Sequence, residues 1–167
     1  MNKSEQFRQS VLNQIEQACQ QVKRDPSTVQ LLAVSKTHPS QTLREMYTVG
    51  QRCFGENYLQ EALTKIDELQ DLDIEWHFIG HVQRNKTKHL AETFDWVHGV
   101  DRFIIAERLS KQRLENQKPL NICIQVNIDG QNSKDGCQPN EVLELVHQIS
   151  QLPNIRLRGL MVIPAPE

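Results

Sequence analysis

Residues 120–136 read LNICIQVNIDGQNSKDG, and this stretch gives the clearest sign of the fold. Over its first half, smaller or polar residues alternate with four apolar ones, Ile122, Ile124, Val126 and Ile128. A period of two is typical of a β-strand, so we predict a strand over residues 120–128. The second half, residues 129–136, is rich in glycine and Asx residues that tolerate positive φ, which predicts a loop. The stretch therefore combines a buried strand with a polar loop at its carboxyl end.

The same pattern of a strand followed by a helix repeats along the chain. Five further short apolar runs predict strands at residues 31–34, 52–55, 75–79, 96–98 and 155–163. Helical stretches follow at residues 40–49, 59–69, 83–93, 101–115 and 139–150, and a helix with an apolar stripe from Phe7 to Val22 precedes them all. This alternation implies an α/β protein with a parallel sheet. Two closures remain open from the pattern alone, namely an open doubly wound sheet and a TIM-type barrel of βα units.

The strand ends show where a site is expected. No GxGxxG or GxxxxGK(S/T) motif follows any of these strands, so the sequence gives no support to a dinucleotide site or a P-loop. In a βα barrel, chemistry collects at the carboxyl ends of the strands. Here those ends carry glycines and several polar or polarisable side chains, among them Lys36, Asn57, His77, Asp129 and Met161. This composition favours a binding site at that edge.

Charge and composition exclude several classes of protein. The 167 residues carry 19 basic and 21 acidic side chains, and a net charge of −2 provides no field that favours nucleic acid or an anionic membrane. No apolar run approaches the roughly 20 residues of a membrane span, and the first residues lack the apolar core of a signal peptide. The four cysteines form no CxxC pair, so we expect a reducing, cytoplasmic location. We expect a single domain over residues 1–167.

Lys36 ends the apolar run LLAVSK of residues 31–36, and two interpretations of it stay open at this point. A strand that reaches the surface would leave this lysine as an ordinary solvated charge. Alternatively, the strand holds the amine at the mouth of a site, where an amine kept partly dry is a nucleophile for aldehydes. The aldehyde most often held in this way is pyridoxal phosphate, bound as a Schiff base.

Two further strand-end residues also carry both a structural and a functional interpretation. Asn57, with Gln60 three residues later, fits a helix capping box, and an N-cap at a strand end can still face a ligand. His77, between two aromatic residues, is either a hydrogen-bonded core histidine or a ring beside a cofactor. His81 follows His77 by four residues, but the two flank a glycine at a strand end, so their spacing gives little support to a zinc site.

Five stretches of the chain together resemble the pyridoxal phosphate homeostasis proteins, also called the proline-synthase co-transcribed family. They are LLAVSKTHP, FGENYLQE, EWHFIGHVQRNK, QVNIDGQNSKDG and LRGLMVIPAPE. The resemblance runs over nearly the whole chain and implies a barrel of the alanine-racemase N-terminal kind, with an extra N-terminal helix and about six of the eight strands. It also implies that pyridoxal 5'-phosphate is the cofactor. Lys36 would bind it as a Schiff base, with Asn57, His77 and Met161 lining the cavity.

The resemblance further implies a role in vitamin B6 homeostasis. Family members bind the cofactor without an established reaction and are thought to buffer and deliver it, so we expect neither a catalytic residue nor a metal ligand. A racemase or lyase that uses the cofactor on an amino acid is the alternative, as is a fragment unable to bind it. The expected partner is the small-molecule cofactor. We expect a monomer, with association through open sheet edges as the alternative.

Two departures from the family pattern bear on these expectations. His81 stands where relatives often have proline, which is a local change. Family members also continue beyond the residues IPAPE with two more strands, whose MGMS-type and RIGT-type loops supply most of the phosphate cradle and an arginine that faces the pyridine nitrogen. We therefore expect this chain to be part of a longer barrel. Arg158 and Lys134 are weaker candidates for contacts with an anion.

Overall fold

One sheet of six parallel strands forms the centre of the computed structural model, which describes residues 3–166. The strands are β1 (Ala33–Val34), β2 (Cys53–Glu56), β3 (Glu75–Phe78), β4 (Trp96–Val100), β5 (Leu120–Gln125) and β6 (Ile155–Met161). They lie in the sheet in chain order, each paired in parallel with the next. A doubly wound sheet would reverse its order at a switch point, so this order is that of a barrel wall and confirms the barrel prediction.

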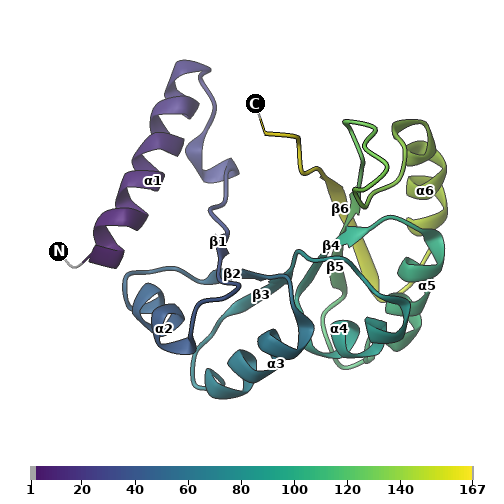
Figure 1. Ribbon diagram of the computed structural model, residues 1–167, viewed down its shortest axis with the longest axis horizontal. Helices are drawn as coiled ribbons and strands as arrows, with labels where there is room; N and C mark the ends of the chain where they lie inside the picture. Colours follow the sequence, from purple (N-terminus) through teal and green to yellow (C-terminus); the bar gives the residue numbers. More distant parts are fainter. Residues whose placement is uncertain (1–2, 167) are drawn as a thin grey trace.

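Helices connect the strands and cover the outer side of the sheet. They are α1 (Lys3–Gln21), α2 (Ser40–Thr48), α3 (Leu59–Glu68), α4 (Thr87–Thr93), α5 (Phe103–Gln112) and α6 (Val142–Ile149), with the 3-10 turns η1 (Pro26–Thr28), η2 (Arg84–Lys86) and η3 (Pro139–Glu141). Figure 1 shows the sheet bending into an arc, with α2 to α6 outside it and α1 beside β1. Within residues 3–166, no helix is both long and apolar enough to cross a membrane.

The two sides of the sheet differ in chemistry, because successive residues of a strand point to opposite faces. The helix side holds most of the apolar core, including Phe54, Trp76, Phe78, Val97 and Ile122, although the buried Glu56 also faces it and pairs there with Lys65. The intervening positions, on the inside of the arc, include Cys53, Glu75, His77, Trp96 and His98. The inner side thus carries several polar groups that the strands could offer to a ligand.

Several strands are shorter than their apolar runs predict, and β1 and β5 show the reason. β5 ends at Gln125 because the following loop folds back onto it: Cys137 N–H donates to the Gln125 carbonyl at 2.9 Å and Asn127 N–H to the Cys137 carbonyl at 2.9 Å. β1 contains only Ala33 and Val34, the two residues that pair with β2. In both cases pairing with a neighbour sets the strand end, and the apolar run does not.

The N-terminal helix forms as predicted, but most of its apolar stripe is uncovered. Cys19 is buried, whereas Phe7 is 62% exposed. Polar bonds join α1 to the start of β2: the Arg8 guanidinium donates to Gln51 Oε1 and to the Gly50 carbonyl, each at 3.2 Å. The apolar stripe therefore identifies the helix correctly but does not mark a buried face.

Candidate functional site

Three of the four predicted site residues gather on one rim of the sheet. β1, β2 and β3 are parallel neighbours, so their carboxyl ends lie side by side. Lys36 follows β1, Asn57 follows β2, and His77 lies in β3. Met161 ends β6, where it pairs with Gln125 of β5. It therefore lies at the same edge but is separated from β3 by two strands.

Lys36 stands in the turn after β1, and its side chain is exposed. His38 N–H closes the turn by donating to the Ser35 carbonyl at 3.1 Å. Thr37 has a φ of 66°, in the left-handed region that β-branched residues rarely enter. In the described residues the lysine is exposed, because the strand ends at Val34 and the lysine lies beyond it in the turn, and its role as a cofactor amine stays a prediction.

Charged side chains of α3 fix this turn on both sides of its lysine. Lys65 Nζ donates to the Ser35 carbonyl at 2.7 Å, and Glu61 Oε1 accepts the Thr37 N–H at 2.6 Å. Lys65 also pairs with Glu61 at 2.6 Å and with Glu56 of β2 at 2.5 Å. The strained conformation of Thr37 is therefore maintained by bonds to groups that are themselves paired.

This cluster is largely buried, and the pKa values of its two carboxyls are shifted. Glu56 is fully buried and Lys65 nearly so, while Glu61 is partly exposed. Burial raises the pKa of the Glu56 carboxyl, an effect that the Lys65 ammonium opposes. The hydrogen bond from Lys65 lowers the pKa of Glu61, and the Thr37 N–H adds to this. None of these three residues was predicted as part of the site, and the one available signal in the sequence is the i,i+4 spacing of Glu61 and Lys65 on a helix.

Asn57 does not cap a helix, so the predicted capping box is wrong. α3 begins at Leu59, and Tyr58 occupies its N-cap position. The side-chain oxygen Oδ1 of Asn57 is instead buried, with no hydrogen-bond partner in the part of the chain that the structure describes. An unmade hydrogen bond of this kind costs about 1–3 kcal/mol. A ligand that donates a hydrogen bond to Asn57 would recover that free energy.

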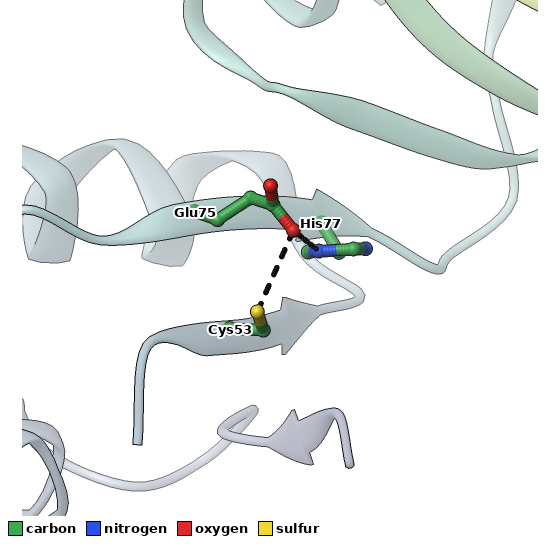
Figure 2. A group of neighbouring side chains, drawn as sticks. All are labelled: Cys53, Glu75 and His77. Carbon is green, nitrogen blue, oxygen red and sulfur yellow. Dashed lines mark hydrogen bonds and ion pairs between the residues drawn. The ribbon is translucent and has the colours of Figure 1, made fainter. Parts of the chain in front are cut away.

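His77 is the hydrogen-bonded interior histidine that the sequence analysis left as one of two interpretations. Its Nε2 lies 2.8 Å from Glu75 Oε1 (Figure 2), its Nδ1 lies 2.9 Å from His98 Nε2, and its ring stacks on Trp96. Burial lowers the pKa of His77, although Glu75 opposes the shift. Burial and the neighbouring His77 lower the pKa of His98 to about 4, so both rings are neutral at neutral pH. Neither nitrogen of His77 is free for a cofactor.

The two weaker candidates for anion contacts already have partners in the protein. The Arg158 guanidinium lies 4.8 Å from the centre of the Trp96 ring and donates to Asn121 Oδ1 at 3.1 Å. Lys134 Nζ lies 3.1 Å from Asp129 Oδ2. These contacts use only part of the hydrogen-bond donors of each cation, and a role for either in a site stays a prediction.

Two of the cavities near the rim have similar volumes. One, of about 460 Å³, is lined by residues that include Asn57, Gly80 and His81. The other, of about 480 Å³, lies between α2 and α3 and is lined by residues that include Thr37 and Lys65. Lys36 belongs to neither lining. The ring of His81 faces Asp135 Oδ1 at 2.9 Å and does not join His77.

Comparison with known proteins covers nearly the whole chain. Residues 10–166 match the family model described as alanine racemase, N-terminal domain. A protein from Pseudomonas aeruginosa, named pyridoxal phosphate homeostasis protein, is 56% identical over 156 residues, which cover 93% of this chain and 68% of that protein. A protein of the same name from Escherichia coli is 49% identical over 160 residues, which cover 94% of this chain and 68% of the relative.

Solved structures agree with this assignment. PipY of Synechococcus elongatus, in a structure described as having PLP bound, has a TM-score of 0.76 at 42% identity, covering 90% of this chain and 70% of that one. An alanine racemase from Clostridium difficile has a TM-score of 0.69 and covers 83% of this chain and 36% of that one. At 12% identity, this second likeness supports the fold alone. The chain therefore belongs to the pyridoxal phosphate homeostasis proteins, within the family that shares the alanine racemase N-terminal domain.

Proposed function

We propose that this protein binds pyridoxal 5'-phosphate at Lys36 and serves the homeostasis of that cofactor in the cytoplasm, without a reaction of its own. The observation that carries the proposal is the fixed turn after β1. Lys65 and Glu61 hold the backbone of Ser35 and Thr37, while Lys36 between them is exposed. The amine is thus presented at the edge where βα barrels collect their chemistry. The PipY structure described with PLP bound supports this choice of ligand.

The described residues fit the cofactor. When bound, pyridoxal phosphate supplies an aldehyde that condenses with a primary amine, and Lys36 offers such an amine. Asn57 Oδ1, which lacks a partner, would accept a hydrogen bond from the ligand. His77 would contribute the wall of the cavity through its ring, since both of its nitrogens are occupied. Met161 would contribute to the wall from β6.

The names of the relatives favour a carrier over an enzyme, because proteins at 56% and 49% identity to this chain are named pyridoxal phosphate homeostasis proteins. We propose that residues 1–167 belong to a single barrel domain of a monomer whose ligand is a small molecule, with neither nucleic acid nor membrane as partner.

Titration with the cofactor tests the proposal. Lys36→Ala is expected to abolish the visible absorption band that a lysine-bound pyridoxal aldehyde produces, whereas Lys111→Ala, on the exposed face of α5, should leave the band unchanged. Borohydride reduction followed by peptide mapping should place the label on Lys36 in the native chain. A native chain that gives no band, or a Lys36→Ala variant that keeps the same band and affinity, would overturn the assignment.

A racemase is the second candidate, and the match of residues 10–166 to the alanine racemase N-terminal domain is the observation in its favour. Racemisation requires a proton donor and a proton acceptor on opposite faces of the substrate. Incubation of the loaded protein with L-alanine separates the two functions. The appearance of D-alanine at a rate that depends on Lys36 would replace the carrier role with an enzymatic one.

A further inference from the structure

We propose that Cys53, Glu75 and His77 form a binding site for a divalent transition metal, with zinc as the preferred ion. Cys53 Sγ lies 3.5 Å from Glu75 Oε1, which lies 2.8 Å from His77 Nε2. All three ligand atoms lie within 4.8 Å of one another. Figure 2 shows the three side chains turned toward one another from two neighbouring strands. The sequence-based prediction was that the chain has no metal ligand, so this proposal departs from it.

The regular pairing of β2 and β3 brings the three residues together. Cys53 is the register partner of Glu75, so their side chains leave the sheet on the same face. Glu75 and His77 are two residues apart on β3 and therefore share that face. Cys53 and His77 are buried, and Glu75 is partly buried. The ligands thus stand on strands and not on loops, which makes the arrangement rigid.

The donor set favours zinc over other common ions. Magnesium and calcium prefer shells made entirely of oxygen, whereas zinc binds thiolate, imidazole and carboxylate together. Ligand atoms around a tetrahedral zinc ion lie roughly 3–4 Å apart, so small rotamer changes complete the fit. Coordination would replace the Cys53 thiol proton, which passes to solvent. Three protein ligands leave the fourth position to a water molecule.

Neighbouring side chains supply the outer shell that protein metal sites usually have. A histidine ligand typically uses its second nitrogen to hold its ring in place. His77 Nδ1 lies 2.9 Å from His98 Nε2, and the Trp96 ring stacks on the imidazole with centroids 5.2 Å apart. The Gln30 amide lies 2.6 Å from Cys53 Sγ. His77 can therefore donate from Nδ1 to His98 while Nε2 presents its lone pair to the metal.

The site does not depend on the proposed function, although His77 is named in both. The metal ligands lie on β2 and β3, while the cofactor amine lies in the turn after β1. Metal binding is therefore measured on the chain without cofactor, and the Lys36→Ala variant should bind metal with unchanged affinity. Failure to bind the cofactor would therefore not count against the metal site, and failure to bind metal would not count against the proposed function.

Cobalt titration tests the site, because a cobalt–thiolate bond gives a charge-transfer band in the near ultraviolet. We expect one cobalt ion per chain, a band that disappears in Cys53→Ser, and displacement of cobalt by zinc. Glu75→Gln and His77→Gln should each weaken zinc binding at least tenfold in competition with a chromophoric chelator. Cys123→Ser is the matched control, since Cys123 is also a buried, free thiol of the sheet and should leave the band and affinity unchanged.

Folding of each variant is checked by circular dichroism. Should the ligand variants fail to fold, His98→Gln replaces them, with an expected loss of about tenfold in affinity through the outer shell. The proposal is overturned if the native chain shows no cobalt–thiolate band. It is equally overturned if the band survives in Cys53→Ser, which would assign the thiolate to another cysteine.

Discussion

Lys65 holds the turn that carries Lys36, although it lies on another element, α3. Its ammonium meets the Ser35 carbonyl and the carboxylates of Glu56 and Glu61. A buried charge is tolerated only when it is paired, so each member of this group depends on the others. At the scale of single residues, the position of the proposed cofactor amine is therefore set by an ion cluster beside it.

Lys65→Ala should reveal this dependence as a large loss of stability. The substitution leaves the fully buried Glu56 carboxylate without its partner, so we expect the free energy of unfolding to fall by about 3–5 kcal/mol. Urea denaturation measures the change. Lys111→Ala, which breaks the exposed pair with Glu107, is the control and should cost no more than about 1 kcal/mol. Equal effects of the two substitutions would show that the buried cluster contributes no more to stability than the exposed ion pair does.

Glu61 should make the stability of the chain depend on pH in the acid range. Its pKa is lowered in the folded state from the usual 4.5, mainly by the hydrogen bond from Lys65. Its contribution is therefore present above pH 4.5 and is lost as the pH falls through the folded-state pKa. We expect the unfolding free energy to decline less steeply in Glu61→Gln than in the native chain on acidification. Parallel curves for the two proteins would contradict this.

At the scale of elements, the backbones that follow β2 and β3 are in close contact at the proposed site. A β-carbon at Gly80 would lie 2.2 Å from the Asn57 carbonyl oxygen, and backbone cannot move aside cheaply. The glycine after β3 thus permits the close approach that brings the strand ends to one rim. The sequence shows a glycine at this strand end but not its contact with Asn57, because the contact joins two separate elements.

Gly80→Ala should separate the two strand ends. We expect a loss of at least about 1–3 kcal/mol in unfolding free energy, together with weaker cofactor binding, since Asn57 is displaced. Gly55→Ala is the comparison, because its β-carbon would meet only side-chain atoms, the nearest being Ile79 Cδ1 at 3.1 Å. Thermal melts and cofactor titrations of both variants measure the difference. A Gly80→Ala variant as stable as Gly55→Ala would refute the close-contact argument.

The strands were predictable because each is an apolar run between polar segments, and that signal is local. Their ends were less predictable: β5 stops at Gln125 because of bonds to Cys137. The site was predictable in part for the same reason. The position of Lys36 at the site could be predicted from the strand before it and from the family resemblance. The bond from Lys65 to Ser35 joins residues 30 positions apart, and neither local sequence shows a pattern that predicts it. Contacts between distant segments account for most of what the sequence did not reveal.

At the scale of the whole molecule, the pattern of strands and helices predicted a parallel sheet but not its closure. Strand order is a property of the assembled sheet, so the residues left both the barrel and the doubly wound sheet open. The family resemblance favoured the barrel, and the consecutive order of β1 to β6 confirms it. The roles of Lys36, Asn57, His77 and Met161 remain predictions that the cofactor experiments test.

The thiols offer a measure of the integrity of the whole fold. All four cysteines are free and buried. Burial raises the pKa of Cys123 and Cys137, and burial together with Glu75 raises that of Cys53 to about 11. Because the thiolate is the reactive form, we expect slow reaction with Ellman's reagent in the native chain and four rapid equivalents in guanidinium. Rapid native reaction of all four would show that the core opens readily.

The consecutive strand order also bears on how the chain is made. A ribosome releases the segments from the amino end, and each new strand finds the strand it pairs with already outside the exit tunnel. Assembly of the described sheet can then keep pace with translation, one βα unit at a time. The bonds that fix the Lys36 turn require nothing beyond Lys65, whereas β4 begins at Trp96. The turn for the cofactor amine can therefore form while most of the wall is still being synthesised.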